Sequence, residues 1–121
     1  MTQVAGTIIG PADHGRRMGL DEFDGAIGRE GRLYELSRGI VIVTDVPNPP
    51  HGDVVFVLRE SLGEYHRAHP GAIHRIYSGA ECKLLIEGTE SERHPDLAVY
   101  KTPAPGSDSS VWSIWVPEIV I

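Results

Sequence analysis

The sequence has little cysteine and no long apolar run. Cys82 is the only cysteine in 121 residues, so the chain can form neither an internal disulfide nor a thiolate-only zinc site. The apolar stretches are far shorter than the roughly 20 residues that span a bilayer. The first residues lack the basic start and apolar core of a signal peptide. These absences predict a cytoplasmic chain that has no membrane partner.

Positive charge is also scarce. The formal net charge is −6, and Lys83 and Lys101 are the only lysines. Affinity for nucleic acid comes mainly from neutralised phosphates, so this balance argues against a strongly basic nucleic-acid binder. The arginines gather in the first two thirds of the chain, where they could form a local basic patch. A solvated surface of mixed charge is the favoured interpretation.

The order of apolar and turn-forming segments predicts an α+β fold. Residues 1–17 are expected to be a loose lead-in, and residues 18–121 one domain. A short helix is predicted at 20–27 and a β-hairpin at 33–44. Helical periodicity extends over 51–69, with Asp53 as the expected N-cap and a stop at Pro70-Gly71. The strands that follow are expected at 73–77, 82–87, 97–100 and 111–121, with a loop at 101–110. We expect a mixed β-sheet with the long helix packed on it, in an α/β sandwich.

A short motif of proline, an acidic residue and an apolar residue occurs twice near the end of the chain. It is present as Pro95-Asp96-Leu97 and again as Pro117-Glu118-Ile119. Proline suits the first position of a strand, since it has no N–H to donate to the ladder. Two such strands side by side would bring both carboxylates to one rim of a sheet, which is a setting for a hard divalent cation.

The sequence stops within an apolar run at Ile121. Strands buried on both faces are apolar in this way, and the carboxylate at the end of such a strand would be costly to place near a core. We therefore hypothesise that the chain is truncated or is a fragment of a longer product.

Five short motifs, taken in order, resemble the Uma2 family of restriction-endonuclease-like proteins in the PD-(D/E)XK nuclease superfamily. The likeness runs from Met18 to the end of the chain, and each motif is short by itself. The motifs are Met18–Phe23, Gly31–Leu36 with Gly39, Pro49–Gly52, His94–Leu97 and Trp115–Ile121.

The resemblance implies a restriction-endonuclease-like core that lacks its last elements, and a DNA endonuclease activity that requires Mg²⁺ or Mn²⁺. Glu35 matches the first acid of the family and Asp96 the second, so both are predicted catalytic residues and metal ligands. Glu118 matches a neighbouring acid of the family. The third acid and the lysine match no position here, and Arg38 and Ile40 stand where carboxylates usually flank Gly39. An inactive or impaired enzyme, which does not retain its metal on purification, is therefore expected.

Structural roles compete with these functional ones. Asp96 could cap a strand end, and Glu35 is equally consistent with a charge pair to Arg38 or Arg32 in the hairpin. His51 could contact a phosphate at the start of the long helix, although satisfying the loop is the favoured role.

Two further patterns are given structural interpretations. The string Glu81-Cys82-Lys83 precedes the Pro-Asp motif instead of following it, so we interpret it as a strand with charges toward solvent and Cys82 as a buried structural thiol. The histidines near the end of the long helix have no acid or thiolate cluster beside them to make a zinc site.

Two hypotheses from different classes follow. The first is a Mg²⁺-dependent DNA endonuclease domain that hydrolyses phosphodiester bonds. The alternative is a non-catalytic interaction or dimerisation module on the same fold, in which an exposed apolar edge at Val111–Ile121 pairs with a second copy of the chain. Plasmid cleavage separates the two.

Overall fold

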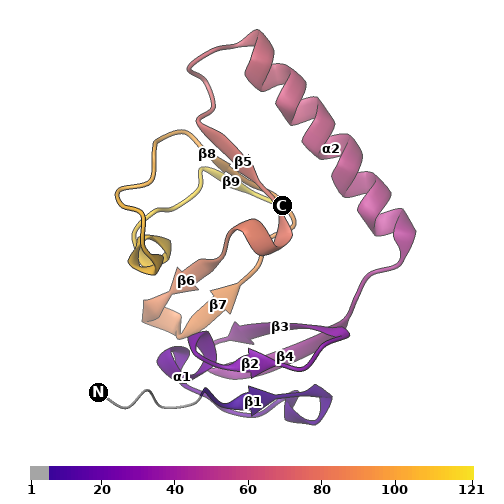
Figure 1. The fold of residues 1–121 in the computed structure, drawn as a ribbon, viewed down its shortest axis with the longest axis vertical. Coiled ribbons are helices and arrows are strands. Elements are labelled where there is room, and N and C mark those ends of the chain that lie inside the picture. Colours follow the sequence, from indigo (N-terminus) through magenta and orange to yellow (C-terminus); the bar gives the residue numbers. More distant parts are fainter. Residues whose placement is uncertain (1–5) are drawn as a thin grey trace. The chain divides into compact units, whose positions relative to one another are not determined.

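A computed structural model describes residues 6–121 (Figure 1). The chain divides into two compact units, and each unit contains two segments of sequence. Unit 1 contains residues 6–46 and 85–93, and unit 2 contains residues 47–84 and 94–121.

Unit 1 is built on the predicted hairpin. Strand β3 (Arg32–Ser37) pairs antiparallel with β4 (Ile40–Asp45), and the turn between them holds Arg38 at φ 50° and Gly39 at φ 78°. Two consecutive residues with positive φ form the kind of turn that matches the twist of the flanking strands, and glycine occupies the second position without steric cost. The sheet continues through β7 (Ser91–Arg93) to β6 (Leu84–Ile86), in the order β4-β3-β7-β6.

The start of unit 1 is more ordered than the sequence predicts. Strand β1 (Ile8–Ile9) pairs parallel with β2 (Ile27–Gly28), and a 3₁₀ turn, η1 (Pro11–Asp13), follows β1. The predicted short helix is α1 (Leu20–Asp24). Ile9 is only 2% exposed and belongs to the core of this unit, so the expected loose lead-in is wrong for these residues. The core draws on β1, α1, β3 and β4 and contains Ile9, Met18, Leu20, Phe23, Leu36 and Val41.

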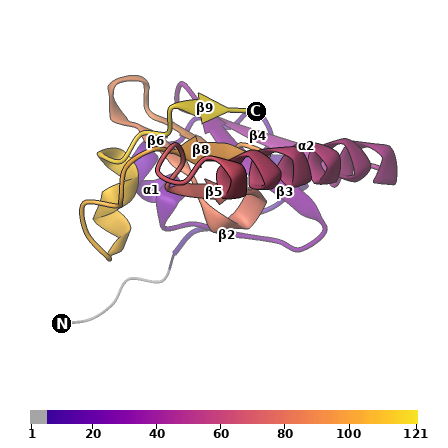
Figure 2. The same cartoon turned by 90° about the horizontal axis from the view of Figure 1, so that it is seen from above.

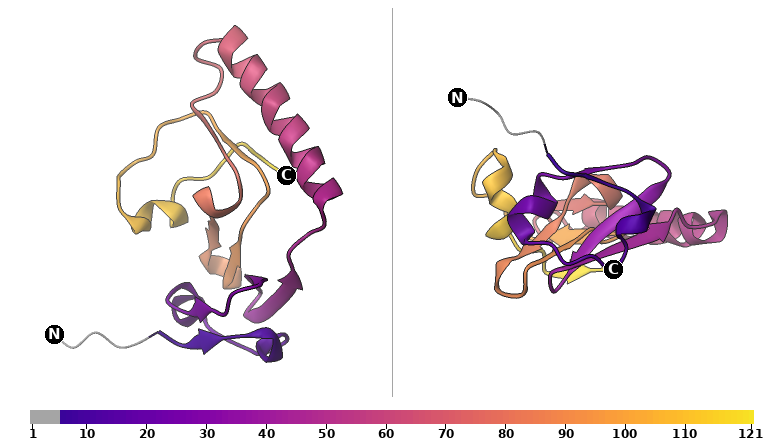
Figure 3. Two further views of the ribbon diagram at one scale, coloured as in Figure 1. Left: turned by 45° about the vertical axis from the view of Figure 1, so that its right-hand side comes forward. Right: turned by 90° about the horizontal axis from the view of Figure 1, so that it is seen from below.

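Unit 2 begins with the long helix α2 (Pro49–Ala68). Asn48 is its N-cap and prolines occupy its first two positions, so the predicted cap at Asp53 is wrong. The stop before Pro70 is confirmed, because His69 is the C-cap. No residue of α2 is buried, although Val55, Leu58 and Leu62 are partly covered. The helix contacts β5 (Arg75–Tyr77). Figure 3 shows the long helix from two further sides.

A three-stranded sheet in the order β5-β8-β9 completes unit 2 (Figure 2). Strand β8 (Ala98–Tyr100) is central and fully buried, and it pairs antiparallel with β5 and with β9 (Ile119–Val120). Short 3₁₀ segments fill the connections. They are η2 (Gly79–Glu81), η3 (Glu87–Thr89) and η4 (Ser109–Ser113).

The core of unit 2 is mostly aromatic. Trp115 stacks on Tyr100 with ring centroids 3.7 Å apart, and Tyr77 meets both rings edge-on. The other buried members are Cys82, Ala98 and Val111. The chain thus has an α+β fold, as predicted, but within residues 6–121 three separate sheets replace the single mixed sheet that the sequence suggested.

Two segments differ from their predicted form. The strand expected at 111–121 is confined to β9, because η4 occupies residues 109–113. Strand β7 was not predicted, since Ser91-Glu92-Arg93 has no apolar alternation. Among residues 6–121, no helix has both the length and the apolar character needed to cross a bilayer.

Candidate functional site

Asp96 lies just before β8, in the predicted Pro-Asp motif, and its side chain is 46% exposed. The neighbouring residue Leu97 exchanges backbone hydrogen bonds with Ile121, at 3.1 Å and 2.9 Å. This ladder fixes the backbone beside Asp96, so the carboxylate projects from a defined strand end instead of a free loop.

His51 lies in the first turn of α2 and approaches this carboxylate. Its Nε2 is 3.1 Å from Oδ2 of Asp96, and its side chain is 45% exposed. The two groups come from segments far apart in the sequence but from the same unit. The sequence indicated only a phosphate or loop contact for His51, and it gave no direct sign of the pairing with Asp96. The one sequence feature that connects the two residues is that each lies in a motif of the Uma2 resemblance, His51 in Pro49–Gly52 and Asp96 in His94–Leu97.

This acid–imidazole pair can hold a proton, a cation or both. A carboxylate beside an imidazole stabilises the imidazolium, and it orients the ring when the imidazole is neutral. A half-exposed carboxylate is also an oxygen ligand of the kind that hard cations select. Because both side chains are open to solvent, a substrate or a hydrated ion can reach them.

Glu35 lies in the other unit, on β3, and its side chain is 26% exposed. Its Oε1 is 3.3 Å from Nε of Arg93, which lies on β7. The competing structural role, a cross-strand charge pair, is therefore present, but with Arg93 instead of Arg38 or Arg32. Arg32 pairs with Asp45 at 3.1 Å. The two predicted metal ligands belong to different units, so their sharing one metal stays a prediction.

The expectation of two carboxylates at one rim is wrong for Asp96 and Glu118. Strands β8 and β9 run antiparallel, with Val99 opposite Ile119. Each strand is preceded by a proline–acid pair, and the two pairs therefore lie at opposite ends of the ladder. Glu118 instead accepts a hydrogen bond from the backbone N–H of Lys101, at 2.7 Å. The two proline–acid motifs would place both carboxylates at one rim only if the two strands were parallel.

The remaining candidates have structural roles. Cys82 is 3% exposed and burial raises the pKa of its thiol, in agreement with the predicted structural cysteine. It precedes β6 and is not part of the strand. Within residues 6–121, no group of three or more histidine, cysteine, aspartate or glutamate side chains is placed to hold a metal ion.

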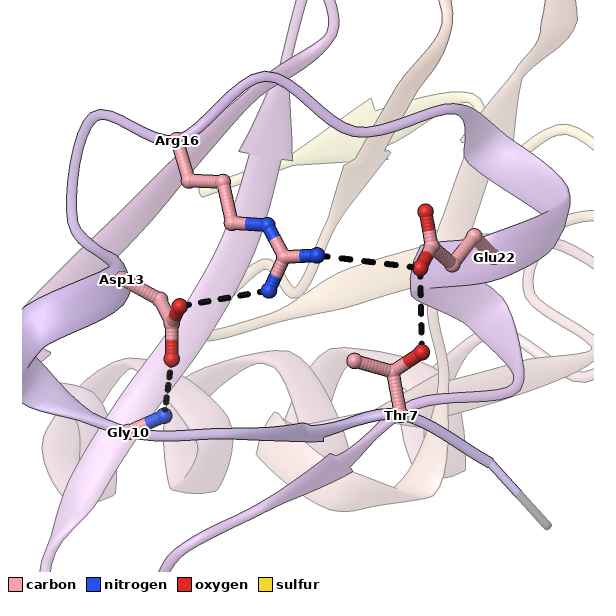
Figure 4. A network of polar contacts seen from close by, with 5 residues as sticks. All are labelled: Thr7, Gly10, Asp13, Arg16 and Glu22. Atoms are coloured by element: carbon pink, nitrogen blue, oxygen red, sulfur yellow. Dashed lines mark hydrogen bonds and ion pairs between the residues drawn. The ribbon is translucent and has the colours of Figure 1, made fainter.

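The arginine-rich first third of the chain contains a polar network around Arg16 (Figure 4). Arg16 lies 3.3 Å from Asp13 and 3.9 Å from Glu22, and the Thr7 hydroxyl donates to Glu22 at 3.0 Å. The N–H of Gly10 donates to Asp13, which is the main reason why the pKa of this carboxyl lies below its ordinary value. The network connects the segments around β1, η1 and α1.

Comparison with known proteins adds nothing to these contacts: no family model, no curated protein and no solved structure matches the chain. The resemblance to the Uma2 family therefore stays a prediction from the motifs.

Proposed function

We propose that this chain is a DNA endonuclease domain that depends on Mg²⁺ or Mn²⁺ and hydrolyses phosphodiester bonds, with its centre at Asp96. The observation that carries the proposal is the pair of Asp96 and His51, half-exposed at the junction of a strand and a helix N-terminus. The motif resemblance supplies the reaction class. The geometry supplies a carboxylate that is held by the β8–β9 ladder and open to solvent.

The residues fit a metal ion that keeps most of its water. Mg²⁺ is commonly bound through one or two carboxylates together with substrate phosphates, so Asp96 alone can be the protein ligand. Such an ion, when bound, neutralises charge on the phosphate and lowers the pKa of a water. Asp96 would hold it, and His51 would orient the carboxylate through Nε2 and could hold a proton beside the phosphate. We expect slow turnover, since no cluster of three ligands forms among residues 6–121.

Plasmid nicking tests the proposal. The purified chain is incubated with supercoiled DNA and Mg²⁺ or Mn²⁺, and a parallel sample contains a chelator. We expect nicking that needs the metal and is reduced by about a hundredfold or more in Asp96→Asn. Glu118→Gln is the matched control, because Glu118 also follows a proline and opens the neighbouring strand; it should cleave like the unchanged chain. Cleavage that survives Asp96→Asn would remove the proposal.

A second function, a dimerisation module, is favoured by one observation. Strand β9 is at the edge of its sheet, and Ile119, Val120 and Ile121 are each about half exposed, at 51%, 49% and 50%. An exposed apolar edge strand is a template for pairing with another chain. If the chain does not cleave, and if it sediments as a dimer that Val120→Lys dissociates, this function is preferred.

A further inference from the structure

A concave site lies in unit 2. It is a pocket of about 360 Å³ between Tyr77 at the end of β5, the loop at 104–109, η4 and Trp115. Small-molecule sites begin at about this volume. Neither Asp96 nor His51 lines it, so it is distinct from the proposed catalytic pair.

Three aromatic rings form the walls of the pocket. Tyr77 lies 5.9 Å from Trp115 with an interplanar angle of 80°, and Trp112 lies 6.1 Å from Trp115 at 35°. The aromatic rings around the pocket therefore lie in different planes. Trp112 is only partly buried, whereas Trp115 is 5% exposed.

The wall is held in place from behind. Tyr100, fully buried, stacks on Trp115 at 3.7 Å, and the indole N–H of Trp115 donates to the carbonyl of Thr102 at 3.0 Å. The orientation of the Trp115 ring is thus fixed by a hydrogen bond and a stacked neighbour. A preorganised aromatic wall costs little conformational entropy when a ligand binds.

The only ionisable side chain in the lining, apart from the phenol of Tyr77, is Asp108. Asp108 is the N-cap of η4, and its Oδ1 accepts a hydrogen bond from the N–H of Ser110 at 3.0 Å. The hydroxyl and the N–H of Ser110 together hold the pKa of Asp108 below its ordinary value. The carboxylate is therefore ionised at neutral pH, and no basic side chain lines the pocket to offset it.

We propose that this pocket binds a small organic cation, such as a quaternary or alkylated ammonium group, between Tyr77 and Trp112 with Asp108 at its rim. Aromatic faces attract cations through the ring quadrupole, by about 0.5–2 kcal/mol for each favourable contact. The carboxylate adds an opposite charge and disfavours phosphates and carboxylates. A neutral aromatic ligand such as a nucleobase could stack on the same rings but would gain nothing from Asp108.

The two tryptophans of the chain provide the measurement, since both line the pocket. Tryptophan fluorescence is recorded while the full chain is titrated with choline. Parallel titrations use 3,3-dimethyl-1-butanol, which has the same shape without the charge, and deoxyadenosine. We expect a saturable change with choline, and binding at least about tenfold weaker for the two neutral compounds.

Two variants locate the site. Asp108→Asn removes the charge but keeps a side chain that is favoured at an N-cap, so the fold should be retained. Trp112→Phe keeps a ring but weakens the cation contact, and Trp115 continues to report. We expect choline binding to fall about three- to tenfold in Asp108→Asn and by a smaller factor in Trp112→Phe. Asp53→Asn, on the exposed side of α2, should bind choline like the unchanged chain.

The outcomes are decisive in either direction. Preference for choline over its neutral analogue, weakened in Asp108→Asn, supports the proposal. No saturable change, equal binding of the two compounds, tighter binding of deoxyadenosine, or a choline affinity that is indifferent to Asp108→Asn would each overturn it. Circular dichroism of every variant confirms that the fold is kept. Because the pocket shares no residue with the pair of Asp96 and His51, failure here leaves the proposed nuclease function intact.

Discussion

The two units of the chain bury different kinds of side chain. Unit 1 encloses a mainly aliphatic core around Leu36 and Val41, and it has surface ion pairs such as that between Arg16 and Asp13. Unit 2 encloses an aromatic core around Tyr100 and Trp115, and it leaves the apolar residues of β9 half exposed.

The difference indicates where function lies. In unit 1 the predicted site residue, Glu35, is already paired with Arg93. Unit 2 has an accessible acid–imidazole pair and an aromatic pocket. Sites that bind ligands tend to be concave, accessible and only partly satisfied within the protein. Unit 2 has these properties, and we therefore place both proposed activities there.

The largest effect on stability is expected from matched leucine-to-alanine substitutions in the two cores. Leu36 in unit 1 and Leu97 in unit 2 both have 0% exposure. Changing either to alanine should lower the free energy of unfolding by about 2–5 kcal/mol, because a cavity remains where the side chain packed. Urea unfolding measures the loss. Native-state hydrogen exchange should show faster exchange mainly in the unit that carries the change, and equal acceleration in both units would contradict the division of the chain.

The next effect concerns the buried phenol of unit 2. Among the described residues, no hydrogen-bond partner is placed at the hydroxyl of Tyr100, and burial raises its pKa from 10.0 to about 12. The folded chain therefore keeps this proton at a pH where the unfolded chain loses it. Its contribution to stability is complete below pH 10 and is lost as the pH rises through 12.

Tyr100→Phe should remove that alkaline dependence and leave stability at pH 7 unchanged or slightly higher, within about 1 kcal/mol, since no hydrogen bond is lost. Thermal unfolding between pH 8 and pH 11 is the measurement. Tyr65→Phe, at a residue that is 50% exposed, is the control and should follow the unchanged chain. A large loss of stability at pH 7 in Tyr100→Phe would show that the hydroxyl has a partner after all.

The smallest effect is expected in the polar network of unit 1. Arg16 is exposed on the surface, and exposed ion pairs contribute little and are screened by salt. Arg16→Gln should lower the melting temperature slightly at low ionic strength, and the difference should vanish at high salt. A loss as large as that of Leu36→Ala would mean that the network, and not the aliphatic core, stabilises this unit.

Local signals in the sequence were sufficient for the elements with strong periodicity or clear turn chemistry. The hairpin around Gly39 and the end of α2 before Pro70 follow from such signals. Strand β7 could not be predicted, because Ser91 and Glu92 become buried only through pairing with β3. Strand direction also depends on long-range pairing, which the sequence pattern does not show. The acids of the two proline–acid motifs were therefore expected at one rim, whereas antiparallel pairing places them at opposite ends of the ladder.

The candidate site was predictable only in part. Asp96 was predicted from its motif, whereas its partner His51 depends on how the start of α2 meets the start of β8, which no local pattern encodes. The aromatic pocket likewise depends on contacts between segments that no local pattern encodes. Tyr77 and Trp112 are far apart in the sequence, and the loop at 104–109 was interpreted only as a connection.

The most direct test of the proposed function is the location of metal binding. The isotope-labelled chain is titrated with Mn²⁺, whose unpaired electrons broaden the NMR signals of nearby nuclei. We predict selective broadening of the signals of His51, Asp96 and Leu97 at low Mn²⁺ concentration, its reversal by excess Mg²⁺, and its loss in Asp96→Asn but not in Glu118→Gln. Broadening that is centred elsewhere, or that persists in Asp96→Asn, would contradict the assignment of this site.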